Sequence, residues 1–118
     1  MTREEARLYT KDLNNILDEI NLIYENARLT KDEPDFYKDI EPFANDVRNR
    51  AQKWYSSIKE VINHNETYIQ GEKQLDQVVE NICTLSVQAF QHRTSYNRFK
   101  SYFQSTKFLL KTIERQLG

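Results

Sequence analysis

The sequence is poor in the residues that interrupt helices or cross-link chains. Its 118 residues include only two glycines, two prolines and one cysteine. An all-β domain needs turn residues about every eight to twelve positions, so this scarcity argues against that class. A single cysteine excludes an internal disulfide and is compatible with a reducing compartment. Cys83 lies among apolar residues, where we expect a small buried side chain without a redox role.

The sequence also has no long apolar run and no excess of one charge. Its longest uninterrupted apolar run, Phe108 to Leu110, is three residues, whereas a membrane-spanning helix needs about 20. The N-terminus opens with charged residues instead of the apolar stretch of a signal peptide. The net charge of −1 creates no overall field that attracts nucleic acid or an anionic membrane. We therefore expect a cytoplasmic protein that does not associate with membranes.

The residues that are present indicate one folded, all-α domain over 1–118. Aromatic residues make up 12% and charged residues 30%, and a disordered chain of this polarity would be poor in aromatics. Apolar residues recur at intervals of three and four, the period of an amphipathic helix. This spacing predicts helices over about 3–31, 42–64, 72–91 and 95–117, with a short helical turn at about 35–40. Short connections between such helices favour an antiparallel up-down-up-down four-helix bundle.

Each predicted helix carries an apolar seam that we expect to face the core. The seams consist of Ala6, Tyr9, Leu13, Ile16, Ile20, Ile23 and Ala27 in the first helix, Phe43, Val47, Ala51, Trp54, Ile58 and Val61 in the second, Leu75, Val78, Val79, Ile82, Leu85, Ala89 and Phe90 in the third, and Phe99, Tyr102, Phe103, Thr106, Leu109, Leu110, Ile113 and Leu117 in the fourth.

Local signals predict where these helices begin and end. Thr2 and Glu5 match a capping box, and Pro34 ends the first helix because the residue before a proline is pushed out of the α region. Pro42 suits the first position of the second helix, where its missing N–H costs nothing. The remaining caps are predicted at Asp35 for the short turn and at Thr94 or Ser95 for the last helix.

Motifs for catalysis, metal binding or cofactor binding are missing. The two histidines, His64 and His92, are not preceded three residues earlier by Glu, as the di-iron sites of helical bundles require. Small helical ribonucleases of the HEPN type carry an Arg shortly before the His, and that spacing is missing too. The only glycines, Gly71 and Gly118, form no phosphate-binding loop. We therefore predict no metal, no cofactor and no enzymatic activity.

The C-terminal part of the chain is basic. Residues 92–118 hold six basic groups against one acid, whereas residues 2–33 hold eight acids against five bases. Arg93, Lys100 and Lys107 are seven residues apart and form one stripe. The stripe is either a surface for nucleic acid or another polyanion, or a solvated face that complements the acidic first helix. The low net charge favours the second interpretation.

Aromatic residues cluster in the connection between the first and second helices. Phe36 and Tyr37 lie close in sequence to Ile40 and Phe43. These side chains either plug the end of the core, which we favour, or line a small groove for a peptide or helix of a partner. The candidate interaction surface consists of Phe36, Tyr37, Arg93, Lys100 and Lys107.

A set of short segments spread through much of the chain resembles a known family. The segments are Pro-Asp-Phe-Tyr-Lys-Asp-Ile-Glu-Pro-Phe-Ala (34–44), Trp54, Glu-Asn-Ile (80–82), Ser-Val-Gln-Ala-Phe (86–90), Arg-Phe (98–99) and Gln-Ser (104–105). In order and spacing they are similar to the YppE-like family, small helical proteins of low-GC Gram-positive bacteria. The resemblance implies an all-helical bundle. It implies no activity or site residue, because no function is established for that family.

The sequence therefore supports two main hypotheses from different classes. The first is a non-enzymatic protein-interaction or regulatory module that presents helix faces or the 35–43 connector to another protein. The alternative is weak binding of nucleic acid or another polyanion through the basic face of the last helix. A metal-free enzyme with a site in the mouth of the bundle is the least favoured class.

Overall fold

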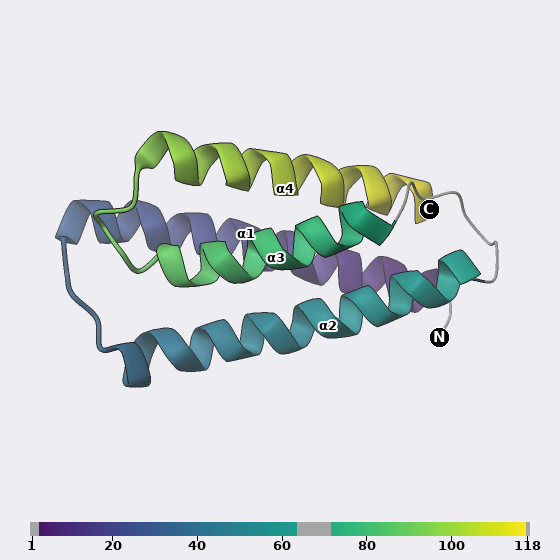
Figure 1. Ribbon diagram of the computed structural model, residues 1–118, viewed down its shortest axis with the longest axis horizontal. Helices are drawn as coiled ribbons and strands as arrows, with labels where there is room; N and C mark the ends of the chain where they lie inside the picture. The colour runs from purple at the N-terminus through teal and green to yellow at the C-terminus, as the bar shows by residue number, and fades with distance from the viewer. Residues whose placement is uncertain (1–2, 64–71, 118) are drawn as a thin grey trace.

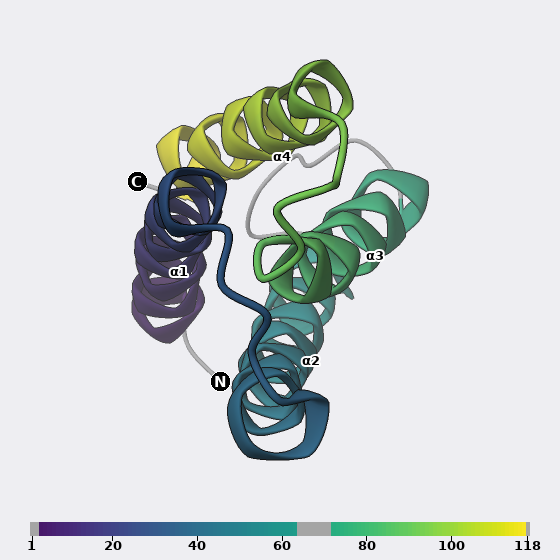
Figure 2. The same ribbon diagram turned by 90° about the vertical axis from the view of Figure 1, so that its left-hand side faces the viewer.

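Four helices run alternately up and down in a computed structural model that describes residues 3–63 and 72–117. They are α1 (Arg3–Thr30), α2 (Glu41–Asn63), α3 (Glu72–Gln88) and α4 (Tyr96–Leu117), and a π-helical turn, η1 (Phe36–Ile40), leads directly into α2 (Figure 1). Tertiary contacts join α1 to α2, α2 to α3, α3 to α4 and α4 back to α1, so the helices form a closed bundle (Figure 2). The predicted fold class, an antiparallel four-helix bundle, is confirmed.

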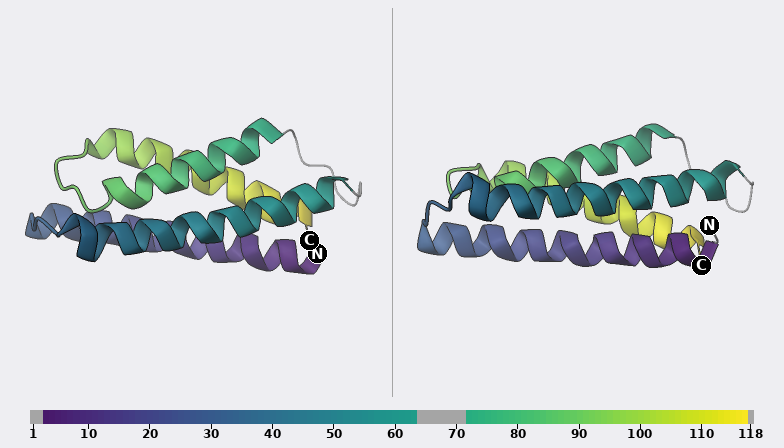
Figure 3. Two further views of the ribbon diagram at one scale, coloured as in Figure 1. Left: turned by 60° about the horizontal axis from the view of Figure 1, so that its bottom comes forward. Right: turned by 90° about the horizontal axis from the view of Figure 1, so that it is seen from below.

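The beginning of α1 and the end of α4 lie at the same end of the bundle (Figure 3). There the Arg3 Nε donates a hydrogen bond of 2.9 Å to the Leu117 carbonyl oxygen. The connectors between α1 and α2 and between α3 and α4 therefore meet at the opposite end (Figure 1). No helix in the described ranges is long and apolar enough to span a bilayer.

The α1 helix ends through its own backbone. Lys31 adopts a left-handed conformation with φ 56°, and its N–H donates a 2.8 Å hydrogen bond to the Ala27 carbonyl oxygen. This is the usual geometry of a helix C-terminus, although glycine is the residue that normally occupies it. Helical structure thus stops at Thr30. The residue that Pro34 restricts is Glu33, three positions further on, so the proline is not what ends the helix. Thr2 of the predicted capping box lies outside the described residues.

The caps of the later helices follow local side-chain chemistry. Asp35 caps η1 as predicted, because its carboxylate accepts a 2.9 Å hydrogen bond from the Lys38 N–H. Of the two candidates for α4, Ser95 is the cap: its Oγ accepts from the Arg98 N–H at 3.4 Å. The α2 helix begins at Glu41, so Pro42 is its second residue. The prediction that Pro42 takes the first position is therefore wrong by one residue.

The third helix is shorter than the predicted 72–91. It ends at Gln88, because the next residues tighten into a turn: the Phe90 N–H donates to the Val87 carbonyl oxygen at 3.2 Å, and the Gln91 N–H to the Gln88 carbonyl oxygen at 3.0 Å. Phe90 thereby leaves the helix and comes to lie at the connector end of the bundle.

The core follows the predicted seams and includes polar side chains that the apolar pattern does not mark. Trp54, Tyr24 and Phe99 are its largest fully buried side chains, and the rings of Tyr24 and Phe99 stack with centroids 3.9 Å apart. Thr10 is also fully buried, and its Oγ1 accepts a 2.9 Å hydrogen bond from the Trp54 Nε1. The predicted seam position Tyr102 is wrong, because this residue is 42% exposed.

Candidate functional site

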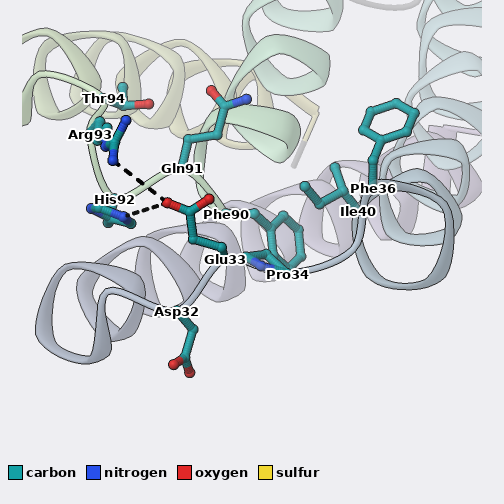
Figure 4. A pocket seen from close by; sticks show the side chains of 10 residues that line it. All are labelled: Asp32, Glu33, Pro34, Phe36, Ile40, Phe90, Gln91, His92, Arg93 and Thr94. Carbon is teal, nitrogen blue, oxygen red and sulfur yellow. Dashed lines mark ion pairs between the residues drawn. The ribbon is translucent and has the colours of Figure 1, made fainter.

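A groove of about 550 Å³ lies at the end of the bundle where the two connectors meet (Figure 4). Residues from both connectors and from η1 line it: Asp32, Glu33, Pro34, Phe36, Ile40, Phe90, Gln91, His92, Arg93 and Thr94. We call it the end groove. Its position depends on the early end of α3, which brings the residues after Gln88 opposite those before η1.

The floor of the end groove is apolar and is continuous with the core. Ile40 is buried. The half-buried Phe90 meets Phe43 edge to face with ring centroids 5.6 Å apart, and Phe43 packs against the core. Phe43 therefore acts as part of the predicted plug of the bundle end, and Ile40 is buried where it lines the groove.

Phe36 and Tyr37 do not take part in this plug. They are 51% and 78% exposed, and their rings contact each other edge to face with centroids 5.3 Å apart. Phe36 lines the end groove, with Tyr37 next to it. The expectation that the whole aromatic connector plugs the core is thus wrong for these two residues. Within this π-helical turn Ile40 is buried, whereas Phe36 and Tyr37 remain exposed.

The rim of the end groove is charged. One oxygen of Glu33, Oε1, lies 3.5 Å from His92 Nε2 and 3.8 Å from Arg93 Nη2, and Figure 4 shows the Glu33 carboxylate facing both side chains. The Glu33 and Arg93 side chains are 74% and 84% exposed. An ion pair this exposed contributes at most about 1 kcal/mol. The contact therefore links the two connectors only loosely.

The predicted basic stripe is divided between two places. Lys100 Nζ lies 2.7 Å from Glu25 Oε1, and Lys107 Nζ lies 2.6 Å from Asp18 Oδ1; both carboxylates belong to α1. Each lysine side chain is only 19% exposed. The predicted complementarity with the acidic first helix is confirmed, but the expectation of a solvated face is wrong for Lys100 and Lys107. They lie in the seam between α4 and α1, where each cation meets a carboxylate.

Of the five predicted surface residues, the structure therefore gathers three. Phe36 and Arg93 line the end groove and Tyr37 adjoins Phe36, whereas Lys100 and Lys107 lie along the α1–α4 seam. Glu33 was not among the residues predicted from the sequence, and His92 was considered only as a metal ligand or as the catalytic histidine of a helical ribonuclease. The signal that these residues offered was their position in connectors, which carry binding residues more often than helix interiors do.

Other reactive groups are few in the described part of the chain. Residues 3–63 and 72–117 contain no cluster of three or more His, Cys, Asp or Glu side chains placed to hold a metal ion. Burial raises the pKa of the Cys83 thiol, and the nearby Arg48 opposes this effect. Because the thiolate is the reactive form of cysteine, this thiol is a poor nucleophile at neutral pH.

Comparison with known proteins identifies relatives of the same shape. The sequence profile of a bacterial domain of unknown function (DUF1798) matches residues 10–117. A protein of unknown function from Listeria innocua is 28% identical, with a TM-score of 0.91 over 98% of this chain and 92% of that chain. YppE from Bacillus subtilis is 19% identical, with a TM-score of 0.90 over 99% and 95% of the two chains.

A third solved structure, a DUF1798 domain of unknown function from Staphylococcus aureus, is 19% identical, with a TM-score of 0.82 over the full length of both chains. At 19% identity the likeness to the Bacillus and Staphylococcus proteins concerns the fold alone. No functionally curated protein matches the chain.

Proposed function

We propose a protein-binding role for this chain, which belongs to the DUF1798 family of bacterial domains of unknown function. The end groove receives an apolar side chain from a partner protein, and Phe36 and Tyr37 provide the surrounding contact area. One observation carries the proposal: two exposed aromatic rings lie beside a groove whose floor is apolar and joined to the core. Aromatic residues are enriched in protein interfaces because they bury a large area and lose little conformational freedom.

The two exposed rings provide enough apolar area for a binding hot spot. Phe36 is 51% exposed and Tyr37 is 78% exposed. Since an aromatic side chain buries roughly 150–250 Å², covering both would remove about 250 Å² from water and contribute about 6 kcal/mol before the entropic cost of association. Only part of this remains as net affinity, which is in keeping with a reversible, regulatory interaction.

The arrangement of the charged groups supports binding over catalysis. His92 and Arg93 approach the same Glu33 oxygen instead of an open position where a reacting atom would lie. Binding of a polyanion through α4 has less support than it had from the sequence. Lys100 and Lys107 are each paired with a carboxylate of α1, so Arg93 is the member of the stripe that extends into solvent.

A pull-down from a bacterial lysate tests the proposal. The immobilised parent protein is compared with a Phe36→Ala/Tyr37→Ala variant, in lysate with and without nuclease treatment. A matched control, Phe108→Ala/Tyr102→Ala, removes the same two residue types from exposed positions on α4. We expect a protein that is retained by the parent and the control, lost by the groove variant and unaffected by nuclease. Retention by the groove variant, or loss on nuclease treatment, would contradict the proposal.

A further inference from the structure

The acidic side chains at the end groove have unused hydrogen-bonding capacity. The Glu33 carboxylate lies 3.5 Å from His92 and 3.8 Å from Arg93, and both distances exceed the roughly 3.2 Å limit of a good N–H···O hydrogen bond. Asp32 is exposed beside it, and only the Asp32 backbone N–H has a partner, Thr30 Oγ1 at 3.4 Å. Within the described residues neither carboxylate accepts a hydrogen bond, so both are available to a partner.

The connector as a whole is negative. Between residues 31 and 41 it carries five acids and two bases: Asp32, Glu33, Asp35, Asp39 and Glu41 against Lys31 and Lys38. Arg93 and His92 face this segment from the other connector, and even with both charged the acids remain in excess by one. A field of this sign attracts basic segments and repels acidic ones.

The charged and the aromatic features lie at different ends of the end groove. Figure 4 shows Glu33 beside His92 and Arg93 at one end, Phe36 at the other, and Phe90 and Ile40 between them. A single extended or helical segment is therefore able to place a basic residue against Glu33 and an apolar residue near Phe36. Arginine fits the first position better than lysine, because a guanidinium binds both oxygens of an exposed carboxylate in parallel.

From these observations we infer that the partner segment is basic and apolar, with an arginine that pairs with Glu33 and a neighbouring apolar side chain that enters the end groove. This inference rests on the proposed function. The arginine takes the place of His92 and Arg93 as the partner of Glu33. The exchange costs little, because the existing contacts are long and exposed, and exposed ion pairs contribute little to stability.

Phage display of a random dodecapeptide library on the folded protein tests the inference. We expect the selected peptides to combine arginine with aromatic or large aliphatic residues. Their binding, measured by fluorescence anisotropy, should be lost with the Phe36→Ala/Tyr37→Ala variant. Glu33→Gln should raise the Kd of an arginine-containing peptide about three- to fivefold, as the loss of an ion pair with a mostly exposed carboxylate implies. Glu33 is mostly exposed, so this variant should fold like the parent.

A matched control and two distinct negative results complete the experiment. Glu19→Gln, at an exposed acidic position of α1, should leave every Kd unchanged. Added salt should weaken peptide binding to the parent and affect Glu33→Gln much less. Groove-dependent peptides that are acidic or uncharged, or an unchanged Kd for Glu33→Gln, would overturn the basic-partner inference and leave the proposed function standing. If no selected peptide depends on Phe36 and Tyr37, the proposed function fails as well.

Discussion

The buried hydrogen bond between Thr10 and Trp54 provides a sharp test of how the core is held together. Both side chains are fully buried. The Trp54 Nε1 donates to Thr10 Oγ1 at 2.9 Å, and the Thr10 hydroxyl donates in turn to the Ala6 carbonyl oxygen at 2.8 Å. Replacing Thr10 by valine keeps the shape of the side chain but removes the acceptor. We therefore expect Thr10→Val to lower the free energy of unfolding.

The expected loss is about 1–3 kcal/mol, the cost of leaving a buried donor without a partner. This exceeds the roughly 0.5–1.5 kcal/mol net contribution of an ordinary hydrogen bond, because the indole N–H of the fully buried Trp54 has no access to water in place of Thr10. In a Trp54→Phe background the donor is gone. There the same Thr10→Val change should cost less than about 0.5 kcal/mol, although Trp54→Phe itself is destabilising because it leaves a cavity.

A double-mutant cycle in urea measures this coupling. Parent, Thr10→Val, Trp54→Phe and the double variant are unfolded under the same conditions, and the free energies are compared only if the m-values agree. The expected coupling energy is about 1–2 kcal/mol. An equal cost of Thr10→Val in both backgrounds would refute the reasoning, since it would mean that the Trp54 N–H finds another acceptor.

Four further predictions concern other parts of the molecule. Ile20→Ala or Ile58→Ala, each at a fully buried position, should lower the free energy of unfolding by about 2–5 kcal/mol in urea melts, and losses below about 1 kcal/mol for both would contradict the packing described above. Lys31→Gly should stabilise the protein by about 0.5–1 kcal/mol, because the left-handed φ of 56° is unfavourable for lysine and acceptable for glycine; an unchanged or lower stability would refute this. Lys107→Ala should cost about 1 kcal/mol at low salt and less at high salt, since it removes the paired and mostly buried cation between α4 and α1, and a salt-independent loss would point to packing alone. Cys83 should react with a maleimide several-fold more slowly in the folded than in the urea-unfolded protein at neutral pH, because burial raises the pKa of its thiol; equal rates would show that the thiol is accessible.

The candidate site was only partly predictable from the sequence. The aromatic connector and Arg93 drew attention because of their residue types, and both are found at the end groove. Glu33 gave no such signal, because an acid beside a proline is an ordinary loop residue. Its role depends on His92 and Arg93, which lie about 60 positions further along the chain and approach Glu33 only because the bundle brings the two connectors together.

What the sequence determined by itself is the set of helices and their buried faces. Apolar residues such as Leu13, Ile16 and Ile20 follow one another at spacings of three and four residues, and this local pattern is repeated on each helix. These three residues are buried, as the helical period requires. Asp35 likewise acts on a backbone N–H three residues away.

The tertiary structure decided what happens to residues at the borders of these faces. Lys100 and Lys107 are partly buried because the acidic flank of α1 lies beside α4. Tyr37 stays exposed while Ile40 is buried, because the direction in which η1 leads into α2 is set by packing against the bundle. Helical period follows from the order of residues along one chain segment, whereas exposure and ion pairing at a border depend on which other segment lies next to it.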